Sequence, residues 1–130
     1  MAAALTWSGD LTFTATSGEQ TMTLDGNSAA GPSPVQTLAF SIAGCMAMDV
    51  VDILRKGRHD VRGLAVAFQG TRAQSPPHRF TDVTMMFTVE GDIPGDAVKR
   101  AIALSHEKYC SVSNSLRGDI TFTTEYEVKL

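Results

Sequence analysis

The chain has 130 residues, of which 43% are hydrophobic and 19% charged, a composition typical of one globular domain and not of a disordered chain. The formal net charge of −3 leaves no basic surplus for phosphates, so neither nucleic acid nor an anionic membrane is an expected partner. The first residues lack the features of a signal peptide, and the apolar stretch 35–48 is expected to be too short to span a bilayer. We expect one cytoplasmic domain over residues 1–130.

Three short strands are predicted in the first quarter of the chain. Apolar residues alternate with polar ones over residues 5–7, 11–15 and 22–24, which is the period-two pattern of half-buried strands. Turn-forming residues at 8–10 and 17–19 separate these strands, and glycines and prolines within 26–34 end the segment.

A long helix is predicted from Ser33 to Lys56. Ser33 is a suitable N-cap residue, and Pro34 suits the first helical position. Apolar side chains then recur at helical spacing, at Val35, Leu38, Ile42, Met46, Val50 and Ile53. Because the other faces of the segment 35–48 are also apolar or small, this central helix is expected to be buried nearly all round.

The second half predicts a hairpin, a second helix and a last strand. The hairpin pairs residues 64–68 with 83–89 around the loop 75–78, and the last strand alternates from Ile120 to Val128. The second helix runs from about Pro94 to Tyr109, and the segment 110–115 either interrupts it or begins a short further helix. Its inner stripe is expected to be Val98, Ala101, Ile102, Ser105 and Tyr109. The resulting order, βββ-α-ββ-α-β, is an α+β fold with mostly antiparallel strands, in two layers around the central helix.

The two cysteines are the main candidates for chemistry. Cys45 lies within the central helix and Cys110 at the end of the second helix, without the C-x-x-C spacing of redox or zinc motifs. They are either small buried side chains of the core or a reactive thiol with its resolving partner.

Helical geometry predicts the electrostatics of Cys45. At about 100° per residue, Asp49 and Asp52 fall within roughly 40° of Cys45, and acidic neighbours raise the pKa of a thiol. A thiolate at Cys45 would therefore require a cation from another element, and the candidates are Arg72, Arg79 and Arg117. Asp49 would either hold that cation beside Cys45 or pair with a base for purely structural reasons.

Other catalytic motifs are missing from the sequence. The three histidines have no metal-ligand spacing, so no metal site and no cofactor are expected. There is no G-x-S-x-G motif of a serine hydrolase and no glycine-rich phosphate-binding loop.

Two segments resemble a known family. Gly31-Pro32-Ser33-Pro34 with Ala43-Gly44-Cys45 and Asp49 to Leu54 is similar to the central helix of the OsmC/Ohr family of osmotically inducible and organic hydroperoxide resistance proteins. The segment from Ala101 to Val112, which includes Cys110, resembles the second-cysteine segment of the same family. The resemblance covers essentially the whole chain and is greatest to the largely uncharacterised OsmC-like branch.

This resemblance implies an OsmC-like fold, an intertwined homodimer and two cysteines near each other at the subunit interface. It also implies a dithiol peroxidase of oxidative stress defence, in which Cys45 attacks an organic hydroperoxide and Cys110 resolves the sulfenic acid to a disulfide. A dithiol of the lipoyl type would then reduce the disulfide.

The sequence departs from the peroxidases of this family at the charged pair that activates the thiol. Those enzymes carry an arginine on an early strand and a glutamate at the start of the central helix, whereas here no arginine precedes Arg55 and the glutamate position falls on Val35 or Gln36. An alternative hypothesis is therefore a dimer of this fold that lacks peroxidase activity and binds a small apolar ligand. A third is a structural dimer with inert thiols.

Overall fold

The element order of the computed structural model, which describes residues 1–130, is βββ-α-ββ-α-β as predicted. The chain divides into two compact units, Met1–Phe40 (unit 1) and Ser41–Leu130 (unit 2). Helix α1, Pro34–Lys56, begins in unit 1 and continues into unit 2. That both units fold as one domain stays a prediction.

Unit 1 contains a three-stranded antiparallel sheet. Strands β1 (Ala4–Gly9), β2 (Thr12–Ser17) and β3 (Gln20–Asp25) are adjacent in chain order, as expected for strands joined by short turns. Directly paired residues point to the same side of a sheet, so the pairing shows which residues share a face. One face of this sheet is apolar. Its cross-strand rows are Leu5, Ala15 and Met22, and next to them Trp7, Phe13 and Leu24.

The connection from β3 to α1 is held by one carboxylate. Asp25 accepts hydrogen bonds from the backbone N–H groups of Asn27, Ala29 and Ala30, at 2.9, 3.3 and 2.9 Å. The bonds from Ala30 and Asn27 are the main reason why the pKa of Asp25 lies below its usual range. A side chain at Gly31 would collide with the carbonyl oxygen of Thr23, which explains why this position is a glycine.

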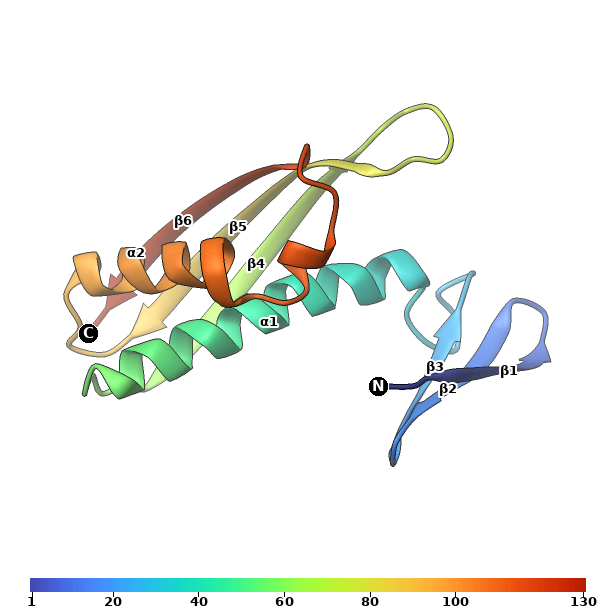
Figure 1. Cartoon of the computed structure of the whole chain (residues 1–130), viewed down its shortest axis with the longest axis horizontal. Coiled ribbons are helices and arrows are strands. Elements are labelled where there is room, and N and C mark those ends of the chain that lie inside the picture. The colour runs from blue at the N-terminus through green and yellow to red at the C-terminus, as the bar shows by residue number, and fades with distance from the viewer. The chain divides into compact units, whose positions relative to one another are not determined.

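Unit 2 contains the second sheet, with both helices on one face of it (Figure 1). Strands β4 (Gly63–Arg72) and β5 (Phe80–Glu90) form the predicted hairpin. Helix α2 (Gly95–Leu104) then carries the chain across to β6 (Thr121–Lys129), which pairs with β5 in parallel. A parallel neighbour requires such a crossover connection.

The buried residues of the unit 2 core come mainly from one face of β5 and one stripe each of α1 and α2. The predicted inward-facing residues of β5 are all fully buried, and α1 contributes one buried stripe at i, i+4 spacing. The buried apolar residues of these elements are Val83, Met85, Phe87, Val89, Ile42, Met46, Val50, Leu54, Val98, Ala101 and Ile102.

The expectation that α1 is buried nearly all round is wrong for the single chain. Only four of its residues are buried, and the side chains of Phe40 and Met48 are 63% and 74% exposed. The apolar character of its other faces is therefore not explained by packing within one chain.

Helix α1 has 23 residues and lies close to the predicted bounds, Ser33 to Lys56. By length and composition alone it is apolar enough to cross a membrane, although the mostly apolar stretch 35–48 within it was expected to be too short to do so. The core helix of a soluble protein meets the same criteria, so this finding does not place α1 in a bilayer.

The chain beyond α2 changes its helical type before it reaches Cys110. Residues Ser105–Tyr109 continue α2 as a π-helical turn, and a 3-10 turn follows at Ser113–Ser115, which is the short further helix considered above. The predicted inner stripe is buried as far as Ser105, but Tyr109 is 53% exposed. The wider π-helical turn changes the angular position of each residue, and this is why helical spacing failed at Tyr109.

Candidate functional site

Helix α1 and the turn after α2 bring the two cysteines together within one chain. The Sγ atoms of Cys45 and Cys110 and a carboxylate oxygen of Asp49 all lie within 4.8 Å of one another. Cys45 and Asp49 are half-buried and Cys110 is fully buried. Asp49 is one helical turn beyond Cys45, so both side chains project from the same face of α1, as the helical wheel predicted.

Cys110 is held by hydrogen bonds at its backbone and at its sulfur atom. Its backbone N–H donates to the carbonyl of Ser105 at 2.7 Å, which closes the π-helical turn. Its Sγ accepts a hydrogen bond from the backbone N–H of Ser113 at 3.3 Å. The side-chain amide of Asn114 donates to the Cys110 carbonyl at 2.8 Å. The 3-10 turn therefore holds this thiol in place.

Cys45 is in an environment that disfavours its thiolate. Burial raises the pKa of the Cys45 thiol, and the neighbouring Cys110 and Asp49 raise it further. The backbone of Val112 acts in the opposite direction. The predicted effect of Asp49 is thus confirmed, whereas Asp52 forms an exposed ion pair with Lys56 at 2.8 Å.

Asp49 is not held by a cation, in contrast to both interpretations that the sequence suggested. Its Oδ2 atom accepts a hydrogen bond from the hydroxyl of Ser105 at 2.8 Å, and Ser105 is fully buried. Asp49 also lines a surface hollow of about 440 Å³. The hollow is lined by Asp49, Asp52, Ile53, Lys56, Leu104 and Tyr109.

Ser105 was predicted on the inner stripe of the second helix, but it was not predicted to be a site residue. A serine among apolar inward-facing residues is the signal that could have found it, because a buried hydroxyl requires a hydrogen-bond partner. The partner could not be identified from the sequence, since Asp49 is on another helix.

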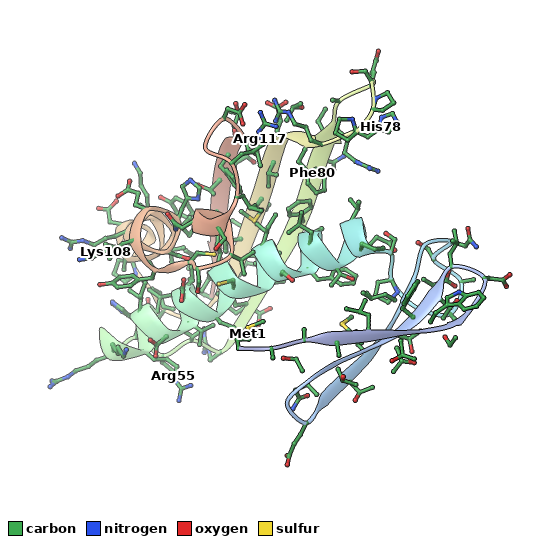
Figure 2. The ribbon with its side chains drawn as sticks, turned by 45° about the vertical axis from the view of Figure 1, so that its right-hand side comes forward. Met1, Arg55, His78, Phe80, Lys108 and Arg117 are labelled. Carbon is green, nitrogen blue, oxygen red and sulfur yellow. The ribbon has the colours of Figure 1, made fainter.

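The three arginines proposed as activators bind other groups. Arg117 forms a two-point ion pair with Asp119, at 2.6 and 2.8 Å, and Arg79 lies 3.6 Å from the same carboxylate. Arg72 donates to the carbonyl of His78 at 2.8 Å. Figure 2 shows Arg117 with His78 and Phe80 at one end of the unit 2 sheet, while Arg55 marks the opposite end of the unit. The activating role expected of one of these arginines therefore has no support in their contacts.

Gln36 has a structural position at the start of α1. Its Oε1 accepts from the backbone N–H of Ser33 at 2.9 Å, while Ser33 Oγ accepts from the backbone N–H of Gln36 at 3.2 Å. These two reciprocal bonds are a capping box. Ser28 also donates its hydroxyl to Gln36 Oε1 at 2.9 Å. Gln36 therefore stabilises the end of the helix, and Ser33 is the N-cap that the sequence predicted.

Comparison with known proteins assigns the chain to a family. The OsmC-like protein family matches residues 25–125, a range that includes both cysteines and Asp49. The chain belongs to the OsmC family. The protein YhfA of Escherichia coli K12 is 42% identical to it over 132 residues, with 98% of each chain covered. The resemblance seen in the two cysteine segments is thereby confirmed.

Solved structures show the same fold. A hypothetical protein from Aquifex aeolicus VF5 is 27% identical, with a TM-score of 0.91 over 98% of this chain and 95% of that one. The organic hydroperoxide resistance protein OhrB of Bacillus subtilis is 17% identical, with a TM-score of 0.67 over 98% of both chains. The predicted α+β OsmC-like fold is confirmed by these neighbours.

Proposed function

We propose that this protein is a dithiol reductase of organic hydroperoxides, with Cys45 as the nucleophile and Cys110 as the resolving thiol. The proposal depends on one observation, the approach of the two sulfur atoms to within 4.8 Å in a single chain. Two thiols at this separation form a disulfide after small side-chain rotations. The family's hydroperoxide resistance proteins, such as OhrB, support the choice of oxidant.

The chemistry has two steps. The Cys45 thiolate attacks one oxygen of the O–O bond, which releases an alcohol and leaves a sulfenic acid on Cys45. The Cys110 thiol then displaces water from the sulfenic acid and forms the disulfide. An external dithiol of the lipoyl type reduces the disulfide and returns both thiols. No metal or organic cofactor takes part in these steps.

Burial distinguishes the roles of the two cysteines. Cys45 is half-buried and is the thiol that a substrate reaches first, whereas Cys110 is fully buried behind the turn that holds it. A buried resolving thiol is protected from further oxidation, because it reacts only with the sulfenic acid beside it.

We further propose that the protein works as a cytoplasmic homodimer. A reducing compartment keeps the two thiols free between turnovers. The apolar surface that one chain leaves exposed on unit 1, at Leu5 and Trp7, supports a dimer.

One observation favours the alternative function, a binding module without turnover. The pKa of Cys45 is raised by burial, by Cys110 and by Asp49, whereas a peroxidatic thiol normally has a lowered pKa. In this alternative, the thiols stay reduced and the protein binds a small apolar ligand.

Counting thiols after a single oxidation decides between the two functions. Freshly reduced protein receives one equivalent of cumene hydroperoxide, and a parallel sample receives hydrogen peroxide. We expect the organic hydroperoxide to remove both thiols per chain rapidly, with a Cys45–Cys110 disulfide seen by mass spectrometry. We expect a slower reaction with hydrogen peroxide.

Two variants separate the steps. Cys110→Ser should still react once and leave a sulfenic acid on Cys45 that a dimedone probe traps, whereas Cys45→Ser should not react. If both thiols of the natural protein stay free on the minute scale, the reductase proposal is wrong and the binding module is the better hypothesis.

A further inference from the structure

The three side chains at the centre of the site are also a set of metal ligands. Cys45 and Cys110 offer one sulfur atom each, and Asp49 offers a carboxylate oxygen. The sequence did not suggest a metal site, because it contains neither histidines at metal-ligand spacing nor a C-x-x-C pair. Here the ligands come from two helical segments that are far apart in sequence and adjacent in the fold.

The geometry suits a tetrahedral zinc ion. Zinc binds thiolate sulfur at about 2.3 Å and carboxylate oxygen at about 2.0–2.2 Å, so that neighbouring ligand atoms lie roughly 3.5–3.8 Å apart. The three ligand atoms lie within 4.8 Å of one another, and side-chain rotations of about an ångström would bring them to these distances. Two sulfur ligands favour zinc over magnesium or calcium, which prefer oxygen.

Hydrogen bonds from outside the ligand set orient two of the three ligands. The buried Ser105 hydroxyl donates to Oδ2 of Asp49, and the backbone N–H of Ser113 donates to Sγ of Cys110. Metal ligands in proteins are commonly held by such second contacts, which fix their direction and their protonation state.

The charges at the site leave room for a cation. Lys56 lines the same hollow as Asp49, but its ammonium group is paired with Asp52 at 2.8 Å. The three candidate arginines are bound to Asp119 and to the carbonyl groups of His78 and Phe80. Two thiolates and a carboxylate require a positive charge, and the basic side chains named above are paired with other groups. A divalent ion would supply that charge.

We propose that the reduced protein binds one Zn²⁺ ion per chain through Cys45 Sγ, Cys110 Sγ and the Asp49 carboxylate, with a water molecule in the fourth position. Binding replaces the two thiol protons, which are released to solvent, and no electrons are transferred. While the ion is bound, both sulfurs are engaged and disulfide formation requires its release. This inference is independent of the proposed peroxidase activity, because it concerns the reduced protein without any oxidant.

Cobalt substitution tests the ligand set directly. Reduced protein is titrated with Co²⁺, and the spectrum is followed for the sulfur-to-cobalt charge-transfer band and for the visible bands of tetrahedral Co²⁺. Zn²⁺ is then added to displace the cobalt, and its stoichiometry is measured by equilibrium dialysis. We expect one ion per chain, with a charge-transfer band of the intensity that two thiolates give.

Variants of the ligands and of their supports should weaken binding in a defined order. Cys45→Ser should abolish the two-thiolate spectrum, and Asp49→Asn should lower the affinity for Zn²⁺ by more than tenfold. Ser105→Ala should lower it by roughly tenfold, the usual effect of removing a second contact to a ligand. Asp96→Asn is the matched control, because it removes the same charge from an exposed side chain outside this hollow and should bind Zn²⁺ as the natural protein does.

An oxidised sample of the natural protein tests the ligand set without relying on variants that could misfold. Its Cys45–Cys110 disulfide removes both sulfur ligands without a change of sequence. This sample should lose the cobalt spectrum and regain it on reduction. The proposal is overturned if reduced natural protein gives no charge-transfer band, or if Asp49→Asn binds Zn²⁺ as tightly as Asp96→Asn. Neither outcome would bear on the hydroperoxide experiment, which is done in the presence of a chelator.

Discussion

The thiolate of Cys45 is disfavoured by burial and by its neighbours, one of which is a carboxylate one helical turn away. Burial is the main reason why the pKa of the Cys45 thiol is raised, and Cys110 and Asp49 raise it further, so at neutral pH the reactive thiolate is scarcer than at an ordinary cysteine. Asp49→Asn removes this charge, and the Asn side-chain oxygen can still accept the hydrogen bond from Ser105. We expect Cys45 of this variant to be alkylated by iodoacetamide roughly three- to tenfold faster at neutral pH, as expected when a nearby like charge is removed.

The pH profile of alkylation checks the sign of this effect. Because the thiolate reacts and the thiol does not, the rate should rise with pH, and the Asp49→Asn profile should lie at lower pH than the natural one. Asp96→Asn serves as the control, since its exposed carboxylate lies outside the hollow that Asp49 lines. Superimposable profiles for all three proteins, measured with a chelator present, would show that Asp49 does not affect the thiol.

The sequence correctly predicted the features of the site that depend on the periodicity of one helix alone. Cys45 and Asp49 share a face of α1 because of helical periodicity, and the structure confirms the effect of Asp49 on the pKa of Cys45. The hydrogen bond from Ser105 joins two helices, so its partner could not be derived from local periodicity. The sequence could not choose among Arg72, Arg79 and Arg117 for the same reason, because the choice requires a long-range contact that charge alone does not specify.

Among the elements, α1 begins at a capping box that can be tested separately from the cysteine site. Ser33 and Gln36 satisfy each other's backbone N–H groups, and helix N-termini otherwise leave such donors without partners. Ser33→Ala removes the hydroxyl acceptor and should lower the free energy of unfolding by about 1 kcal/mol. Urea denaturation followed by far-ultraviolet circular dichroism measures this loss as a lower midpoint.

A conservative change at the other half of the capping box is the matched variant. Gln36→Glu keeps an oxygen that accepts from the Ser33 N–H and adds a negative charge near the helix N-terminus, where it is favourable. We therefore expect its midpoint to equal or exceed that of the natural protein. A loss as large as that of Ser33→Ala would mean that Gln36 contributes through something other than the cap.

Local sequence patterns predicted the order of the elements, but they did not predict two features of the fold. The strands and α1 were predicted close to their observed bounds because periodicity, turn residues and the N-cap all agree there. The π-helical turn at Ser105–Tyr109 and the parallel pairing of β6 with β5 were missed. Both depend on how α2 packs in the fold, and single-sequence periodicity contains no information on that packing.

In the whole molecule, the exposed apolar face of the unit 1 sheet is not explained by packing within a single chain. None of the residues of unit 1 is a buried hydrophobic residue, and the apolar face of its sheet leaves Leu5 and Trp7 54% and 65% exposed. A three-stranded sheet requires a covered hydrophobic face to be stable in water. An exposed apolar surface of this kind marks an interaction site, and we propose that a second copy of the chain covers it.

Neighbouring residues of β1 provide a matched test of the dimer, because Leu5 lies on the apolar face and Thr6 on the opposite face. We expect the natural protein and Thr6→Lys to sediment as dimers, whereas Leu5→Lys should sediment as a monomer, because the interface would have to bury an unpaired charge. Trp7 is the only tryptophan, so its emission should shift to longer wavelength as the dimer dissociates. A natural protein that remains monomeric at all concentrations would disprove the homodimer, and equal dissociation of both variants would show that the interface does not distinguish the two faces of this sheet.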